Sequence, residues 1–260
     1  MKTLLLSSCA VLALLVSPVR AAEHAEAMMR ATFKLFNKDS TATCFLVRDG
    51  ADVFLVSAAH TFEKASGETS ILVLREADKD GTWKRQDKEI SIRESERALW
   101  TKHPQQDLAV MRVVLELPED ATLPVDALKA DGFPRFGDQV MLLTYPARVE
   151  ANGAGFPLAR QAVVGSFAAE PMEKQPEFII DATAWDGDSG GPVFIDAGKG
   201  RPQIVGLVTA RINHVENITS ERETRKIETP MGLSKALPSA LILETIRLAK
   251  NTVEVPASNR

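Results

Sequence analysis

Short apolar and β-branched runs recur along most of the chain, and no long helical pattern alternates with them. Runs of this length and composition predict β-strands. They fall at Thr32–Phe36, Thr43–Val47, Val53–Ser57, Ser70–Leu74, Glu89–Ile92, Leu108–Val114, Gln139–Leu143, Gln161–Phe167, Phe178–Ala182, Pro192–Ile195, Ile204–Thr209 and Ile227–Leu233. Turn signals such as Asp49-Gly50 and Asn152-Gly153 separate many of them. The pattern therefore predicts an all-β barrel or sandwich.

Two later segments differ from this pattern. Residues 115–137 contain three prolines and little periodicity, which indicates a link between two β halves. After Pro238, we expect Ser239 to be the N-cap of a helix over Ala240–Lys250. Apolar Ile242, Ile246 and Ala249 would then share the buried face of that helix. Residues 251–260 are predicted to be a polar tail.

The first 21 residues have the pattern of a secretory signal peptide. Lys2 precedes the apolar run Leu4–Val16, which is too short to cross a bilayer, and small residues precede a predicted cleavage after Ala21. Cleavage after Ala22 is an alternative, and a lipoprotein signal at Cys9 is less favoured because little apolar sequence precedes it. We therefore expect a periplasmic or secreted protein. No later stretch is long and apolar enough to predict stable membrane insertion.

Composition limits the possible partners. The chain has 260 residues, is 45% hydrophobic and 25% charged, and carries a net charge of −4. Removing residues 1–21 would remove Lys2 and Arg20 and no acid, which changes 31 basic residues to 29 against 35 acidic ones, a net −6. No basic block stands out, so nucleic acid is not an expected partner. Cys44 would remain as a lone cysteine, without an internal disulfide.

The clearest chemical signal is the stretch Trp185–Phe194, WDGDSGGPVF, in which three glycines surround Ser189. Glycine is costly in regular structure, so such a cluster marks a sharp turn or a close backbone approach. A serine needs a neighbouring base to act as a nucleophile. His60, at the end of the apolar run FLVSAAH, and Asp107, which opens DLAVMRV, are candidates for the base and its orienting acid. No His-Glu-x-x-His spacing occurs, and neither metal nor cofactor is expected.

These residues resemble the trypsin/chymotrypsin-like serine peptidases, and among them the exported bacterial branch that includes the HtrA-type proteases. The matching motifs are Ala58-Ala59-His60, Asp107-Leu108-Ala109-Val110 and Gly187-Asp188-Ser189-Gly190-Gly191-Pro192-Val193. Their order and their spacings of 47 and 82 residues fit the family. No room remains after the last helix for the PDZ domain of HtrA-type proteins.

The resemblance implies two six-stranded antiparallel β-barrels followed by a helix. It implies an N-terminal barrel at residues 28–120, a C-terminal barrel with the terminal helix at 135–250, and a tail at 251–260. The function implied is hydrolysis of peptide or protein substrates through an acyl-enzyme, with no cofactor. The oligomeric state is left open.

The same resemblance implies a role for each site residue. Ser189 would be the nucleophile, His60 the general base and Asp107 the group that orients the imidazole. The backbone N–H groups of Gly187 and Ser189 would form the oxyanion hole. Thr183 would lie at the base of the specificity pocket and Thr209, Ala210 and Arg211 would form one wall. Because Thr183 is uncharged, the bottom of this pocket would be uncharged too. We therefore expect preferred substrates to have a small or medium uncharged residue before the scissile bond.

Two departures from the family pattern carry predictions. Cys44 replaces a common glycine, and we interpret it as a small buried residue. Asp188 occupies the position of the acid that, in the digestive branch, pairs with a newly cut apolar N-terminus. The start Ala22-Glu23-His24 is polar and acidic, so we expect Asp188 to have another partner or solvent, with no activating cleavage beyond signal removal.

Two alternative functions remain. Gly187-Asp188-Ser189-Gly190-Gly191 also satisfies Gly-x-Ser-x-Gly, the nucleophile elbow of α/β-hydrolase esterases, which requires a helix directly after the serine. Gly190-Gly191-Pro192 is a poor helix start, so this alternative is disfavoured. A catalytically inactive peptidase fold used for binding is the second alternative, since the alignment of the three groups cannot be deduced from sequence.

Overall fold

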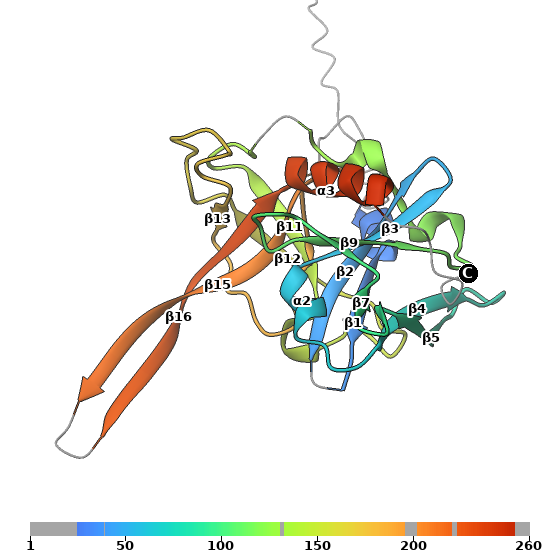
Figure 1. Cartoon of the computed structure of the whole chain (residues 1–260), viewed down its shortest axis with the longest axis horizontal. Coiled ribbons are helices and arrows are strands. Elements are labelled where there is room, and N and C mark those ends of the chain that lie inside the picture. Colours follow the sequence, from blue (N-terminus) through green and yellow to red (C-terminus); the bar gives the residue numbers. More distant parts are fainter. Residues whose placement is uncertain (1–24, 39, 131–132, 196–201, 220–222, 253–260) are drawn as a thin grey trace, which may run out of the picture.

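The computed structural model describes residues 25–38, 40–130, 133–195, 202–219 and 223–252. Most of its regular secondary structure consists of strands in two sheets, and a helix near the C-terminal end packs across both (Figure 1). The all-β architecture with a C-terminal helix is thereby confirmed. The predicted signal peptide and residues 253–260 of the predicted tail lie outside the described residues. No described helix has both the length and the apolarity required to cross a membrane.

The first sheet has eight strands, arranged β5-β4-β1-β2-β3-β9-β8 with β10 beside β2. Its members are β1 (Thr32–Phe36), β2 (Thr41–Asp49), β3 (Asp52–Ser57), β4 (Thr69–Ala77), β5 (Trp83–Ser91), β8 (Thr101–Lys102), β9 (Ala109–Val113) and β10 (Leu123–Pro124). The pairs are antiparallel except β10 with β2. Along the chain, a separate hairpin of β6 (Arg93–Glu94) and β7 (Arg97–Ala98) follows β5 and precedes β8.

The second sheet has six strands in the order β12-β11-β14-β15-β16-β13. These are β11 (Gln139–Thr144), β12 (Leu158–Val163), β13 (Phe178–Ile180), β14 (Pro192–Ile195), β15 (Gln203–Thr219) and β16 (Thr224–Pro238). A bridge between Val164 and Ile180 joins the two end strands of this order. The sheet therefore closes on itself as a barrel does.

Helices are few and short apart from the last. Residues 25–30 are helical, followed along the chain by α2 (Ala59–Glu63), three 3₁₀ turns, η1 (Glu119–Ala121), η2 (Val125–Ala127) and η3 (Pro146–Arg148), and then α3 (Ser239–Thr252). The predicted apolar face of α3 is confirmed, because Ile242, Ile246 and Ala249 are buried in one core cluster with residues of both sheets. The helix thus fixes the two sheets to each other.

Several predictions need correction. The strand predicted at Gln161–Phe167 is β12 at Leu158–Val163, and β15 and β16 extend far beyond the apolar runs that predicted them. The eight-stranded first sheet exceeds the expected six, because β8 and β10 are only two residues long and give no sequence signal. Ser239 lies inside α3, and its hydroxyl donates to the Lys129 carbonyl at 2.6 Å. The division at residues 28–120 and 135–250 stays a prediction.

The outer parts of β15 and β16 form a two-stranded ribbon that projects away from both sheets (Figure 1). We call residues 211–219 and 224–233 the arm. Register shifts after Val208 and after Ile212 separate it from the sheet. β13 pairs only with residues 234–236 of β16, so the arm extends beyond the strands that flank it in the body.

Candidate active site

His60 is the second residue of α2, which begins just after β3. The apolar run that ends at His60 is therefore strand only as far as Ser57; Ala58 has extended backbone and the helix begins at Ala59. The His60 backbone N–H donates to Asp107 Oδ1 at 2.8 Å, and its Nδ1 lies 2.6 Å from Asp107 Oδ2. Two contacts to one carboxylate therefore fix both the backbone and the imidazole ring of His60.

Asp107 belongs to a tight loop between β8 and β9. Buried His103 shapes this loop, since its Nδ1 accepts the backbone N–H groups of Gln105 and Gln106 at 3.2 and 3.1 Å. Burial raises the pKa of Asp107, but the hydrogen bonds and charge of His60 outweigh it and hold that pKa below the ordinary aspartate value. Asp107 is therefore an anion at neutral pH, suited to accept a hydrogen bond from the Nδ1–H of His60.

Ser189 lies on the glycine-rich loop before β14, where backbone approaches from several sides leave no room for side chains. A Cβ on Gly187 would come within 2.2 Å of the Tyr145 carbonyl oxygen, and one on Gly190 within 2.2 Å of the Thr43 carbonyl oxygen. Both glycines have positive φ, +104° and +85°. The glycines expected from the sequence to allow a close approach do so at these two positions.

Thr43 of β2 joins this loop to the first sheet. Its N–H donates to the Ser189 carbonyl at 2.9 Å and its hydroxyl to the Gly187 carbonyl at 2.7 Å. The same hydroxyl accepts the Tyr145 N–H at 3.2 Å. The position of the serine loop therefore depends on a residue from the opposite sheet.

Asp188, beside the serine, is fully buried and paired with Arg160 of β12, whose Nη2 lies 2.5 Å from its Oδ2. The Trp185 N–H donates to the same oxygen at 2.7 Å. Burial raises the pKa of Asp188, and the charge of Arg160 acts against this rise. Arg160 also donates to the Thr183 carbonyl at 2.8 Å. An internal arginine is thus the charge partner of Asp188, as the alternative of another partner had predicted.

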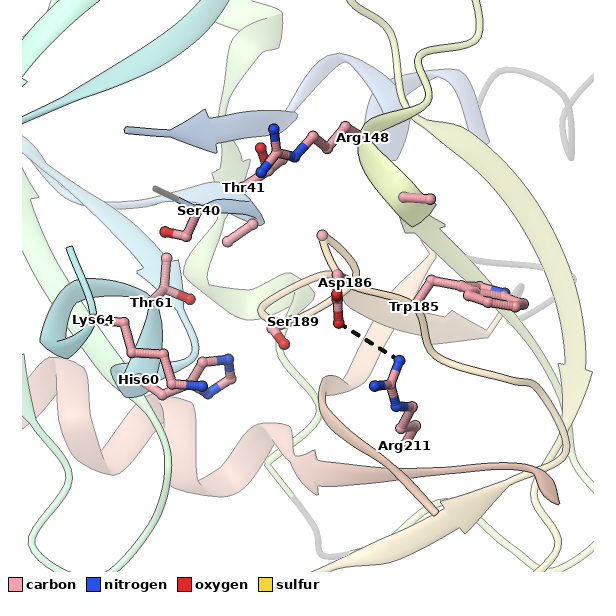
Figure 2. A pocket seen from close by; sticks show the side chains of 13 residues that line it. Ser40, Thr41, His60, Thr61, Lys64, Arg148, Trp185, Asp186, Ser189 and Arg211 are labelled. Carbon is pink, nitrogen blue, oxygen red and sulfur yellow. Dashed lines mark ion pairs between the residues drawn. The ribbon is translucent and has the colours of Figure 1, made fainter. Parts of the chain in front are cut away.

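The side chains of His60 and Ser189 face one cavity of about 470 Å³ (Figure 2). Lys64, Arg148 and Arg211 also line it, with Asp186 as the acid among its lining residues. Arg211 Nη1 lies 3.6 Å from Asp186 Oδ1, and this ion pair spans part of the cavity beside Ser189 (Figure 2). The Ser189 hydroxyl donates to the Thr209 carbonyl at 3.4 Å. No hydrogen bond joins it to His60 among the described residues.

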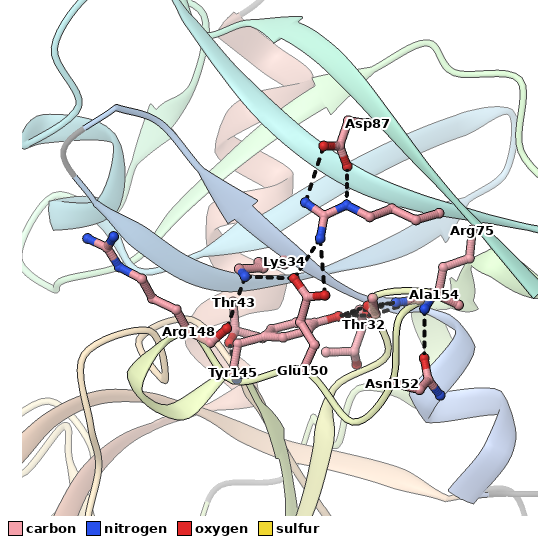
Figure 3. Close-up of polar contacts among 12 residues, drawn as sticks. Thr32, Lys34, Thr43, Arg75, Asp87, Tyr145, Arg148, Glu150, Asn152 and Ala154 are labelled. Carbon is pink, nitrogen blue, oxygen red and sulfur yellow. Dashed lines mark hydrogen bonds and ion pairs between the residues drawn. The ribbon is translucent and has the colours of Figure 1, made fainter.

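The loop after β11 forms another side of the cavity and carries backbone strain. Ala147 and Arg148 both have positive φ, +49° and +71°, which is rare for residues with a Cβ. Lys34 Nζ donates to the Arg148 carbonyl at 3.0 Å and to Glu150 at 2.7 Å, and Arg85 also pairs with Glu150 (Figure 3). These contacts from the first sheet hold the loop in its strained conformation.

The sequence of this chain matches a known protein family. Residues 42–207 match the family described as the trypsin-like peptidase domain. The chain belongs to this family. Membership supports a protease function of the trypsin-like serine type, acting on peptide or protein substrates. A search of the curated proteins finds no match.

Solved structures show the same fold at low identity. Rv3671c from M. tuberculosis, in an inactive form, is 17% identical with a TM-score of 0.52, over 92% of this chain and 93% of that one. The HtrA-type protease AlgW with a tripeptide is 20% identical with a TM-score of 0.54, over 87% of this chain and 62% of that one. Human heparin binding protein is 14% identical with a TM-score of 0.55, over 88% and 95%. The chymotrypsin-like fold is thereby shown.

The predicted substrate-binding residues of this trypsin-like peptidase domain lie in different surroundings. Arg211 lines the cavity and Thr209 offers its carbonyl to Ser189. Thr183 and Ala210 are not among the cavity-lining residues. Cys44 is fully buried, as expected, and burial raises the pKa of its thiol. Ser189 is followed by strand β14, where the esterase elbow requires a helix.

Sequence reasoning missed Arg160 and Thr43, and also Lys64 and Arg148 at the cavity, whereas Arg211 was predicted. Arg160 had a detectable signal: it shares the inward face of β12 with Ala162, so a charge there requires a buried partner. Thr43 had none, because a threonine within an apolar strand is ordinary. Its partners come from residues more than 100 positions away.

Proposed function

We propose that this chain is a serine endopeptidase that hydrolyses peptide bonds through an acyl-enzyme. Ser189 attacks the scissile carbonyl, and His60 accepts its proton and later donates it to the leaving amine. Asp107 orients the imidazole and stabilises it when charged. Water then hydrolyses the acyl-enzyme by the reverse sequence of proton transfers. No metal or cofactor takes part.

The contact that carries this proposal is the one of 2.6 Å between His60 Nδ1 and Asp107 Oδ2. An anionic carboxylate at this position favours the tautomer with the proton on Nδ1. The Nε2 atom is then the proton acceptor, as a general base requires. Because the same carboxylate also accepts the backbone N–H of His60, the ring has little freedom to turn away.

The Ser189 hydroxyl must change its partner for the reaction. Its bond to the Thr209 carbonyl is long, at 3.4 Å, and therefore weak. Rotation about the Cα–Cβ bond of Ser189 toward His60 is the step that we assign to substrate binding. A substrate N–H at the Thr209 carbonyl would displace the hydroxyl and favour this rotation.

Backbone N–H groups at Gly187 and Ser189 are the proposed oxyanion hole. The Asp186 carbonyl accepts the Ala147 N–H at 2.8 Å, so it is directed to the strained loop after β11. In a trans peptide the C=O and N–H groups point in opposite directions, so the Gly187 N–H points away from that loop. Removing one oxyanion donor typically costs about 10²–10³ in rate.

The ion pair of Asp186 and Arg211 supports a preference for small or medium uncharged residues before the scissile bond. Both residues line the cavity together with Ser189, and we infer that the Arg211 side chain limits the size of the residue that fits there. Thr183, Thr209 and Ala210 remain the proposed neutral surroundings of the specificity pocket. We also propose export to the periplasm or the cell exterior after removal of residues 1–21, and the division into units at 28–120 and 135–250.

Hydrolysis of casein, compared with a short ester, tests this function. The purified protein of residues 22–260 should degrade casein, and Ser189→Ala and His60→Ala should each reduce the rate by about 10⁴-fold or more. The double variant should be little worse than either single one, since the residues act as a unit. Full casein hydrolysis by Ser189→Ala would contradict the proposal, and ester hydrolysis without casein hydrolysis would favour an esterase.

A binding protein without catalysis is the second candidate. The Ser189 hydroxyl is bonded to Thr209 and not to His60, and the fold is shared with a human protein named for heparin binding. A correctly folded wild-type protein that hydrolyses neither substrate would favour this candidate.

A further inference from the structure

One edge of β15 pairs with β16, and its other edge passes Ser189 and continues along the arm. Inside the body, β14 occupies this edge as far as Leu207, and Val208 exchanges hydrogen bonds with Gly190 and Gly191 at 2.8 and 2.9 Å. Ser189 lies where this pairing stops, with its hydroxyl on the Thr209 carbonyl. Beyond that point no described strand pairs with this edge of β15.

Proline fixes the direction of the backbone groups along the arm. Pro230 is the partner of Asn213 and has no N–H to donate, so this must be a pair without ladder hydrogen bonds. Antiparallel pairs alternate, so the pairs of Val215 with Glu228 and of Asn217 with Lys226 are of the same kind. The N–H and C=O groups of Asn213, Val215 and Asn217 therefore point outward from the ribbon. They extend the row that begins beside Ser189.

The two outer edges of the arm differ in side chains. On β16, backbone groups point outward at Lys226, Glu228 and Pro230. Charged residues and prolines at such positions hinder the addition of another strand. The matching positions on β15 are Asn213, Val215 and Asn217, all uncharged. These β15 residues are exposed or partly exposed, Val215 by 45%. From Asn213 to Asn217, the β15 edge is thus more open to another strand than the β16 edge.

We propose that the outer edge of β15 from Arg211 to Asn217 is a docking strand for the upstream segment of a polypeptide substrate in extended conformation. This proposal rests on the proposed function and adds a surface for residues far from the scissile bond. The substrate would pair antiparallel to β15, as β14 does in the body, and so run from the arm toward Ser189. The backbone pairing would accept many sequences, because main-chain groups give the affinity.

We expect the affinity for a substrate to depend on the length of its extended segment before the cut. Residues 211–217 at about 3.3 Å per residue span roughly 20 Å, which corresponds to about six substrate residues beyond those in the cavity. Substrates with a long extended segment before the cut should therefore bind better than short ones. Folded proteins without a free extended segment gain nothing from the arm.

A matched pair of proline variants tests the proposal in the Ser189→Ala background. Val215→Pro and Glu228→Pro alter the two members of one pair, and each removes only an outward N–H, the first from the β15 edge and the second from the β16 edge. The probe is fluorescein-labelled α-lactalbumin that has been reduced and carboxymethylated, so that it stays unfolded. Fluorescence anisotropy should show binding weakened about threefold to tenfold by Val215→Pro. Glu228→Pro should bind like the parent protein.

Three results would overturn the proposal: no binding of the unfolded probe by the parent, equal weakening by both variants, or a wild-type dimer in sedimentation velocity that Val215→Pro dissociates. The last would assign the edge to a second copy of the chain. Circular dichroism checks folding, and Asn217→Pro against Lys226→Pro repeats the comparison if the first pair folds poorly. The binding assay needs no catalysis. Hydrolysis of a short peptide by the wild-type protein tests the proposed function separately.

Discussion

At the scale of single residues, the pair of Arg160 and Asp188 shows why the serine loop is already formed. The buried Asp188 carboxylate would otherwise be left without a charge partner next to the nucleophile. Its contacts with Arg160 and the Trp185 N–H hold the turn that carries Gly187 and Ser189. Losing the arginine should therefore affect stability in a pH-dependent way.

We predict that Arg160→Met lowers the free energy of unfolding by about 3 kcal/mol at pH 8, because it leaves a buried charge unpaired. The folded-state pKa of Asp188 is already raised by burial and would rise further without Arg160. A carboxyl with a raised folded-state pKa favours folding at low pH, and this advantage disappears as the pH rises through that pKa. The loss should thus be smaller at pH 5. Urea unfolding at pH 5 and pH 8 measures this loss in the free energy of unfolding, with Arg247→Met at an exposed position as the control. An equal loss at the two pH values would contradict the account.

A second residue-scale prediction concerns the Asp186–Arg211 ion pair. Arg211→Gly should widen the cavity beside Ser189, so that large apolar residues before the cut gain about tenfold in kcat/KM relative to alanine. Profiling on a peptide library measures the change, and Arg135→Gly, on a side chain exposed by 87%, is the control. If the wild-type protein preferred lysine or arginine before the cut, the proposed uncharged specificity pocket would be wrong.

The sequence alone predicted His60, Asp107 and Ser189 as site residues because their three motifs occur together in an order and spacing that fit one family. The structure brings His60 and Asp107 into contact and places Ser189 at the same cavity as His60, while their catalytic roles stay a prediction. Asp188 was predicted to be solvated or paired with another group, and the structure shows the second of these. Arg160 could not be named from the sequence, because it lies 28 positions away and only the folded chain brings it to Asp188. The helix that carries His60 was not predicted, because α2 has five residues and is too short to show helical periodicity.

At the scale of elements, the apolar run at Ile204–Thr209 located the buried part of β15 and missed its solvent-exposed extension, whereas the run at Ile227–Leu233 lies in the exposed part of β16 and missed the buried part. β15 was predicted only over its buried residues, since the arm contains charges and no clear alternation. The terminal helix was predicted well, because its apolar spacing reflects burial against both sheets. That helix is the element whose packing can be tested most cleanly.

We predict that Ile246→Ala lowers the free energy of unfolding by about 3 kcal/mol, the usual cost of a buried cavity of this size. Ile246 is 1% exposed within the cluster that joins α3 to both sheets. The neighbouring Arg247 is exposed, so Arg247→Ala should change stability by less than about 0.5 kcal/mol. Urea denaturation compares the two variants, and equal effects would show that α3 contributes little to holding the sheets together.

At the scale of the whole molecule, contacts between the two sheets complete the site without a free N-terminus. Thr43 and Lys34 from the first sheet hold the serine loop and the loop after β11. Arg160 already pairs with Asp188 from within the second sheet. The Asp188 carboxylate therefore already has a cationic partner, and a newly cut N-terminal amine is not needed to neutralise it.

We predict that residues 22–260 carrying an uncleavable N-terminal tag have the same kcat/KM as the untagged protein on one peptide substrate. Activity that appears only after a cut exposing a new N-terminus would contradict this. Mass spectrometry of the tagged protein after the assay checks that the tag has remained.

The central claim, that Ser189 is a nucleophile activated by His60 and Asp107, is tested most directly by a fluorophosphonate probe and intact-mass spectrometry. The account predicts one adduct per chain, mapped by peptide analysis to Ser189. The adduct should be absent in Ser189→Ala and should form at least about 10³-fold more slowly in His60→Ala. A folded wild-type protein that stays unlabelled, or an adduct on a residue other than Ser189, would contradict the account.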